Sequence, residues 1–160
     1  MTGERRTRVG AYALCLDEAG RILLCRIAPS VAPGEIWTLP GGGLEFAEPP
    51  GVAVVRELAE ESGYVGEVVG LLDVSDRLIT HERTGDREHA IEIVYRVQVT
   101  GGALRDEVDG STDTCDWFTS SDASRLHLGK FARGALALVA APHAATGTAL
   151  DPAAGDGSDA

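Results

Sequence analysis

Residues 41–64 read GGGLEFAEPPGVAVVRELAEESGY, and this segment is the most informative part of the sequence. It begins with three glycines and continues into a stretch with helical signals. Pro49 and Pro50 suit a first helical turn, apolar residues recur after them, and Gly63 is a natural C-terminal stop. We therefore predict a helix between Pro49 and Gly63, preceded by a glycine loop.

The predicted helix has an acidic face and an apolar face. Counted at about 100° per residue, three carboxylates share an arc of about 100°: Glu57, Glu60 and Glu61. A separate apolar arc, suited to packing on a sheet, consists of Val54, Val55 and Leu58. Like charges at these spacings destabilise a helix, so a cation is expected among them. Carboxylate oxygens select Mg²⁺ or Mn²⁺ rather than zinc. A solvated acidic face is the alternative.

The loop before the helix suits a phosphate ligand. Gly41-Gly42-Gly43 lets backbone groups approach a ligand without Cβ atoms in the way. The loop also leads to the positive end of the helix dipole, where phosphate is favoured. Arg56 follows Glu48 by eight residues, and a pair between them would tie the loop to the helix.

These residues resemble the Nudix box, G-x5-E-x7-R-E-U-x-E-E-x-G-U with U apolar. The match covers every specified position: Gly42, Glu48, Arg56, Glu57, Leu58, Glu60, Glu61, Gly63 and Tyr64. Residues 37–40, Trp-Thr-Leu-Pro, resemble the W-x-L-P lead-in common in the family. Ala47 departs from the family, because a glycine is usual there. The resemblance implies an α/β fold, a Nudix-like α/β/α sandwich with a mixed β-sheet.

The resemblance also implies an enzyme that hydrolyses a pyrophosphate bond in a nucleoside diphosphate linked to another group, with a nucleoside triphosphate as the default substrate. Water attacks phosphorus, and Mg²⁺ or Mn²⁺ is the cofactor. Carried over by position, the metal ligands are the carbonyl of Gly41 and three catalytic carboxylates, Glu57, Glu60 and Glu61. Either Glu57 or Glu60 orients or deprotonates the water, while Gly42, Glu48 and Arg56 are structural. A non-catalytic nucleotide-binding or regulatory domain is the alternative, although such domains tend to lose glutamates that this chain keeps.

Further candidate site residues lie outside this segment. Many family members supply another acid from a downstream loop, and here we favour Asp109 as a metal ligand, with Glu107 next; Asp113 follows this loop in the sequence and is a further acid of the same region. A solvated loop is the alternative. Substrate binding is expected of Trp37 and His89, against the alternatives that Trp37 packs under the loop and that His89 is an exposed strand-end histidine.

The rest of the chain predicts one domain over residues 7–141, between a flexible N-terminus (1–6) and a disordered, acidic, low-complexity tail (142–160). Two apolar runs joined by a turn-like cluster predict a hairpin, Val9–Leu16 with Arg21–Ile27. The remaining predicted elements are extended segments at Glu35–Leu39, Val68–Ile79, Ala90–Val99 and Asp113–Thr119, and a closing helix at Lys130–Ala141.

Composition limits the partners and the location. The chain has 160 residues and a net charge of −11, which disfavours nucleic acid and anionic lipid as partners. No run is long enough for a membrane helix. Three cysteines without a close pair, Cys15, Cys25 and Cys115, argue against a disulfide framework and predict buried thiols in a reducing cytoplasm. The expected partner is a nucleotide-type small molecule, and family resemblance adds a homodimer.

Overall fold

The computed structural model describes residues 3–140, so the predicted tail at 142–160 lies outside the described residues. The elements in chain order are β1 (Arg5–Leu14), β2 (Ile22–Ile27), β3 (Trp37–Thr38), β4 (Gly41–Gly43), α1 (Pro50–Ser62), β5 (Tyr64–His81), β6 (Asp86–Gly102), β7 (Thr112–Phe118), α2 (Ser120–Ala123) and α3 (Lys130–Ala140).

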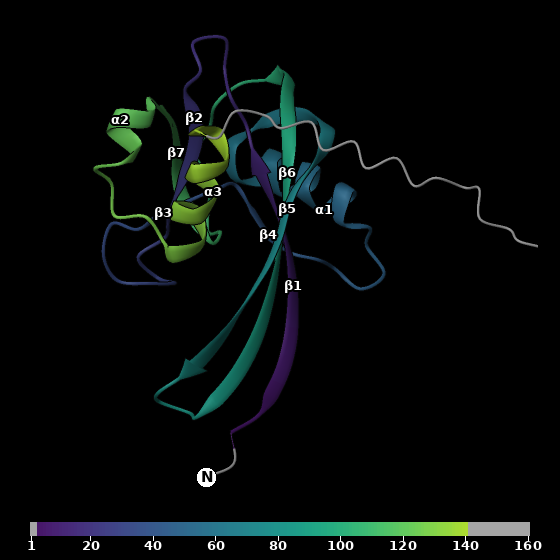
Figure 1. The fold of residues 1–160 in the computed structure, drawn as a ribbon, viewed down its shortest axis with the longest axis vertical. Coiled ribbons are helices and arrows are strands. Elements are labelled where there is room, and N and C mark those ends of the chain that lie inside the picture. Colours follow the sequence, from purple (N-terminus) through teal and green to yellow (C-terminus); the bar gives the residue numbers. More distant parts are fainter. Residues whose placement is uncertain (1–2, 141–160) are drawn as a thin grey trace, which may run out of the picture.

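The strands form two sheets (Figure 1). The larger has the order β4-β1-β6-β5 and is mixed, since β1 runs parallel to β6 and antiparallel to β4. The smaller has the order β3-β2-β7 and is antiparallel throughout. Strand β6 therefore lies between β1, which precedes it by some eighty residues, and its hairpin partner β5.

Helices α1 and α3 cover opposite faces of the strands. Alternate residues of β1 point to opposite faces, as in any strand. Ala11 belongs to the apolar cluster that contains Leu58 of α1, whereas Tyr12 belongs to the cluster that contains Ala132 of α3. The neighbouring residues of β2 divide between the two clusters in the same way. This arrangement confirms the predicted α/β/α sandwich with a mixed sheet.

Helix α1 follows the prediction closely. Its apolar face is buried, with Val54 and Leu58 both fully inaccessible to solvent. It ends at Gly63, whose φ of 76° is left-handed and whose N–H donates to the carbonyl of Ala59 at 3.0 Å. Glycine adopts this conformation without a Cβ clash, which is why the helix stops there. Among residues 3–140 no helix is long and apolar enough to cross a membrane.

The predicted hairpin of the first two strands is wrong beyond its turn. A single bridge joins Leu16 to Ile22, after which β1 enters the four-stranded sheet and β2 the three-stranded sheet. Each strand finds its main partner far away in the sequence, β6 for the first and β7 for the second. Apolar runs reveal that two strands exist, but they do not reveal this choice of partners.

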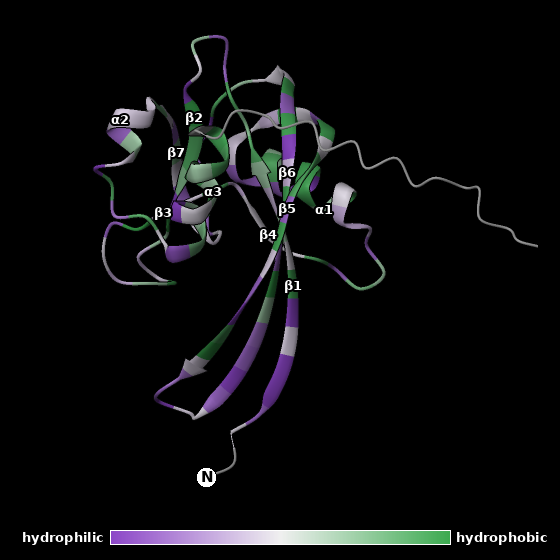
Figure 2. Cartoon of the chain, in the orientation of Figure 1, coloured by the Kyte–Doolittle hydropathy of each residue, from purple (hydrophilic) through white to green (hydrophobic). Residues whose placement is uncertain are grey.

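The predicted flexible N-terminus, residues 1–6, overlaps the start of β1. Strand β1 begins at Arg5, which lies opposite Arg87 of β6, and the N–H of Glu4 donates to Asp86 at 2.8 Å. The outer ends of three strands, residues 5–9, 74–81 and 86–91, form a projection that we call the arm (Figure 1). Its tip is largely hydrophilic (Figure 2), which is why apolar patterning alone missed the start of β1.

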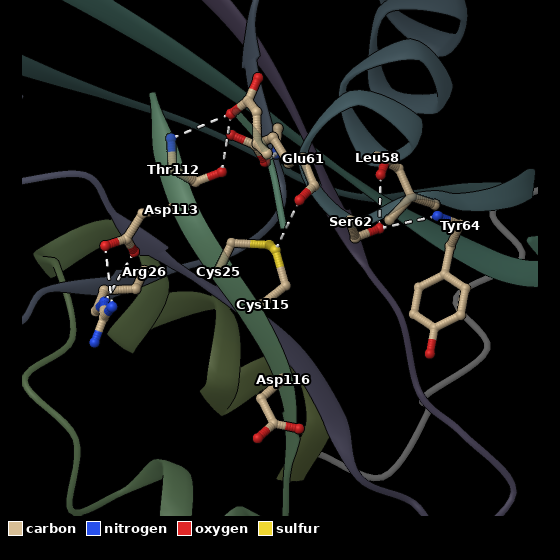
Figure 3. Close-up of a disulfide and its surroundings, with 12 residues drawn as sticks. Cys25, Arg26, Leu58, Glu61, Ser62, Tyr64, Thr112, Asp113, Cys115 and Asp116 are labelled. Carbon is tan, nitrogen blue, oxygen red and sulfur yellow. Dashed lines mark hydrogen bonds and ion pairs between the residues drawn. A yellow bond between two sulfur atoms is a disulfide. The ribbon is translucent and has the colours of Figure 1, made fainter. Parts of the chain in front are cut away.

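The prediction of three free thiols is wrong for Cys25 and Cys115, which form a disulfide (Figure 3). The two residues are 90 apart in the chain but directly opposite each other in neighbouring strands β2 and β7. The sulfur of Cys115 lies 3.4 Å from the carbonyl oxygen of Glu61, at the end of α1. Cys15 is a free, buried thiol as predicted, and burial raises its pKa to about 12. A reducing environment can therefore no longer be argued from the cysteines.

Candidate active site

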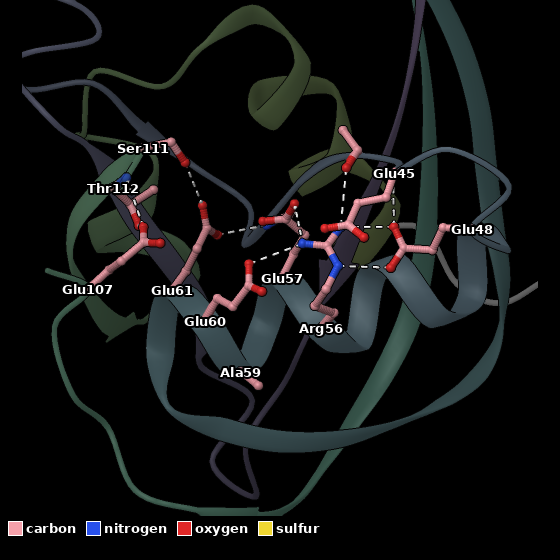
Figure 4. Close-up of polar contacts among 12 residues, drawn as sticks. Glu45, Glu48, Arg56, Glu57, Ala59, Glu60, Glu61, Glu107, Ser111 and Thr112 are labelled. Atoms are coloured by element: carbon pink, nitrogen blue, oxygen red, sulfur yellow. Dashed lines mark hydrogen bonds and ion pairs between the residues drawn. The ribbon is translucent and has the colours of Figure 1, made fainter. Parts of the chain in front are cut away.

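Helix α1 carries the three predicted glutamates, Glu57, Glu60 and Glu61 (Figure 4). Glu61 is 1 % exposed, whereas the side chains of Glu57 and Glu60 are 14 % and 50 % exposed. The acidic arc predicted from the helical periodicity is therefore present. Its members differ in environment, and each has its own set of contacts.

Glu61 joins two other segments to the last turn of α1 through hydrogen bonds. Its carboxylate accepts a hydrogen bond of 2.8 Å from the N–H of Gly41 and one of 3.2 Å from the hydroxyl of Ser111. Burial, together with the nearby charges of Glu57 and Glu107, raises the pKa of Glu61 to about 8, although the hydrogen bonds from Gly41 and Ser111 oppose that shift. Sequence reasoning missed Ser111, because a single serine in a loop carries no recognisable signal.

Glu57 lies against the backbone of the glycine strand. A Cβ atom at Gly42 would come within 2.7 Å of the Glu57 carboxylate, closer than real Cβ atoms approach such groups. Glycine at this position therefore leaves the space that the carboxylate occupies. Burial also raises the pKa of Glu57, although the adjacent Arg56 opposes that shift. The structure thus explains why Gly42 belongs to the motif.

Arg56 connects the loop, the helix and the glycine strand. Its guanidinium donates to both carboxylate oxygens of Glu48, at 2.8 and 2.9 Å, which confirms the predicted pair. It also donates to Glu57 at 3.0 Å and to Glu60 at 3.1 Å. The pairing lowers the pKa of Glu48 to about 2. One cation therefore holds the loop in place and offsets the repulsion between two glutamates.

The downstream loop brings Glu107, rather than Asp109, toward the helix. Glu107 accepts hydrogen bonds from Thr112, and its charge raises the pKa of both Glu57 and Glu61. Asp109 is exposed and has a left-handed φ of 58°. Asp113 is held by Arg26. Asp109 lies at the turn of the loop and Glu107 lies nearer to α1. The sequence alone did not show where this turn is.

The two residues expected to bind substrate lie elsewhere. Trp37 is 8 % exposed and its ring packs edge-on against Phe118 at 4.9 Å, which favours packing over stacking on a base. His89 lies on the exposed arm, with its ring 2.7 Å from Asp76. Among the described residues, neither makes a hydrogen bond or ion pair with the three glutamates of α1.

The donor chemistry of this site fits a hard divalent cation. The glutamates of α1 and Glu107 offer carboxylate oxygens, which suit Mg²⁺ or Mn²⁺. The Glu57 carboxylate fills the space that a Cβ at Gly42 would take, so the glycine strand and the helix acids are matched in shape. Within residues 3–140, no three acidic, histidine or cysteine side chains are already gathered as a metal cluster, and Glu57, Glu60 and Glu61 instead accept hydrogen bonds from Arg56 and the N–H of Gly41.

Comparison with known proteins identifies the family. The family profile described as NUDIX domain matches residues 6–139. The chain belongs to the NUDIX family. The human diphosphoinositol polyphosphate phosphohydrolase 3-beta is 37 % identical over 93 residues, 56 % of this chain and 51 % of the relative. The mouse diphosphoinositol polyphosphate phosphohydrolase 2 is 33 % identical over 121 residues, 72 % of this chain and 60 % of the relative. The chain therefore spans between half and three-fifths of these curated NUDIX relatives.

Solved NUDIX structures share the fold. The MutT NUDIX hydrolase from Burkholderia pseudomallei is 33 % identical, with a TM-score of 0.68 over 83 % of this chain and 98 % of that one. The NUDIX domain of Shewanella oneidensis NrtR, solved with ADP ribose, is 17 % identical, with a TM-score of 0.66 over 85 % and 86 % of the two chains. At that identity the second comparison supports the fold alone.

Proposed function

We propose that this NUDIX protein is a divalent-metal-dependent hydrolase of a pyrophosphate bond, in a nucleoside diphosphate linked to another group or in a related phosphoanhydride. The observation that carries the proposal is the acidic face of α1 beside the glycine strand, with Glu57, Glu60 and Glu61 all retained. Non-catalytic domains on this fold tend to lose these glutamates, whereas this chain keeps all three.

The metal, Mg²⁺ or Mn²⁺, would be held by the carbonyl of Gly41 and by the three glutamates of α1. We add Glu107 as the loop ligand in preference to Asp109, because its charge is felt by two of the three glutamates. When bound, such an ion neutralises phosphate charge and makes bound water more acidic. Gly42 leaves room for the acids, and Arg56 orients Glu57 and Glu60. The base that accepts the proton of the attacking water is Glu57 or Glu60.

The substrate class extends beyond nucleotides. Two relatives of this chain are named as diphosphoinositol polyphosphate phosphohydrolases, and a structural relative is named MutT. All of these names are compatible with cleavage of a phosphoanhydride. We therefore propose that the substrate is a small, highly anionic molecule with a pyrophosphate bond, rather than nucleic acid or a membrane. A homodimer is a further proposal.

The test measures the release of phosphate and pyrophosphate from a panel of substrates, in parallel reactions that contain Mg²⁺, Mn²⁺ or EDTA. The panel holds nucleoside triphosphates, ADP-ribose, dinucleoside polyphosphates and a diphosphoinositol polyphosphate. Metal-dependent release that disappears in Glu60→Gln supports the proposal. No release from any compound by folded, metal-loaded protein refutes it and favours the non-catalytic domain. Glu67→Gln, at an exposed position on β5, is the matched control.

A further inference from the structure

The arm contains a shallow pocket of about 300 Å³, and its lining residues Arg5 and Thr7 alternate along β1 with Ala11, on the face where α1 packs. Its lining is basic and consists of Arg5, Arg6, Thr7, Leu78, Arg87 and His89. These described residues include no acidic side chain, although the chain as a whole has a net charge of −11. A concentration of arginines in so acidic a protein calls for a physical explanation.

The register of the sheet forces two of these arginines together. Arg5 of β1 and Arg87 of β6 are direct partners in neighbouring strands, which are about 4.8 Å apart. Like charges in this arrangement repel and destabilise the pairing. The next pair shows the usual solution, because Arg6 lies opposite Glu88 and forms an ion pair with it. Arg5 and Arg87 lack such compensation.

The described part of the chain holds no acid in an ion pair with either Arg5 or Arg87. Asp76 of β5 contacts His89 instead, at 2.7 Å. Both arginines are exposed, so their guanidinium groups are free to receive a ligand. The missing counter-charge must therefore come from solvent ions or from a bound anion.

We propose that this pocket binds a phosphate group of a small-molecule ligand. Two guanidinium groups facing one space can each form paired hydrogen bonds with phosphate oxygens. The hydroxyl of Thr7, which lies opposite His89 in the register, adds a neutral donor. Leu78 supplies an apolar wall. Phosphate binding also removes the repulsion between Arg5 and Arg87, so the ligand stabilises the arm.

The pocket lies on the same face of β1 as the catalytic helix. Ala11 is the register partner of Gly42, which contacts Glu57, and Thr7 lies four residues along the same strand face. That separation is about 13 Å at the usual rise per residue. The phosphate thus comes either from a distal group of the substrate, an assignment that rests on the proposed function, or from a separate polyphosphate that occupies the arm independently.

Binding is tested without turnover, by calorimetric titration of the full chain with tripolyphosphate in EDTA at constant ionic strength. We expect Arg5→Gln/Arg87→Gln to weaken binding at least tenfold, while Arg83→Gln in the adjacent turn, where acids also line the surface, leaves it unchanged. At low salt without ligand, Arg87→Gln is expected to raise the melting temperature because it relieves repulsion. Wild-type protein that does not bind tripolyphosphate, or a double variant that binds it equally well, overturns the proposal.

Kinetics with Mg²⁺ then separate the two sources of phosphate. If the group belongs to the substrate, the double variant raises KM for substrates with an additional phosphate and leaves kcat and the KM of simpler substrates unchanged. If it belongs to a separate ligand, KM stays constant for all substrates while tripolyphosphate still binds. Tripolyphosphate binding through Arg5 and Arg87 in a chain without hydrolase activity keeps the pocket and refutes the proposed function alone.

Discussion

The N–H of Gly41 donates a hydrogen bond of 2.8 Å to the carboxylate of Glu61, so the glycine strand is fixed to the last turn of α1. The two residues are 20 positions apart in the chain. The carboxylate that we propose as a metal ligand therefore also determines where the proposed carbonyl ligand lies. The side chain of Glu61 therefore has both a structural role and a proposed role in metal binding.

Glu60→Gln and Glu61→Gln are expected to keep the fold and to lose at least about a hundredfold in turnover, because each removes a charge that the proposed metal requires. A glutamine at 61 can still accept from Gly41 and donate to Ser111. The measurements are kcat and thermal melting of each variant, with Glu67→Gln as the exposed control. Turnover near the wild-type value in either variant would contradict the ligand assignment.

The loop acid is tested by comparing Glu107→Gln with Asp109→Asn. Because the charge of Glu107 affects two helix glutamates, we expect its variant to lose more activity and to need more Mg²⁺ for half-maximal rate. Asp109→Asn keeps the exposed loop tip and serves as the matched change. A larger loss of activity in Asp109→Asn than in Glu107→Gln would favour Asp109 as the loop ligand, as the sequence suggested.

The pair between Glu48 and Arg56 predicts a loss of stability in acid. The folded-state pKa of Glu48 is lowered to about 2, below its ordinary value of 4.5. The contribution is therefore complete above that ordinary value and disappears as the pH falls toward 2. Urea unfolding of wild type and Glu48→Gln across this range should give a stability difference that shrinks with acidification. A difference that does not change with pH would exclude an ionic origin.

Ala47 predicts a stabilising substitution. Its φ of 62° is left-handed, a conformation that costs an alanine about 1–2 kcal/mol. Glycine relieves that cost but gains freedom in the unfolded chain, so Ala47→Gly should stabilise by about 0.5–1 kcal/mol. Asp109, with φ of 58°, is the control, because aspartate tolerates this region better and Asp109→Gly should gain less. Denaturant unfolding measures both, and equal gains would argue against local strain at Ala47.

The disulfide between Cys25 and Cys115 predicts how many cysteine thiols react in the unfolded chain. Unfolded without reductant, the chain should show one reactive thiol, from Cys15, and with reductant it should show three. Reduction should also lower the free energy of unfolding by about 2–5 kcal/mol, because the bond closes a long loop. Three reactive thiols before reduction would show that Cys25 and Cys115 are not joined.

The sequence was most informative where local patterns carry the structure. Helical periodicity and Gly63 predicted α1 almost to its ends, and the spacing of Glu48 and Arg56 predicted their ion pair. It did not predict the short strand β4 or the single-turn helix α2, because neither has a repeating pattern. Residues joined by sheet register escaped it too, as Cys25 and Cys115 show, since register depends on partners distant in the sequence.

The pairing of early strands with late ones has a consequence for biosynthesis. Strand β1 completes its ladder with residues 87–96, and β2 completes its own with residues 112–118. Contacts that join distant residues form slowly, because a long loop must close first. A ribosome must therefore release residues 5–96 before β1 can complete its pairing with β6, and residues 22–118 before β2 can complete its pairing with β7, and until then the apolar faces of β1 and β2 are available to chaperones.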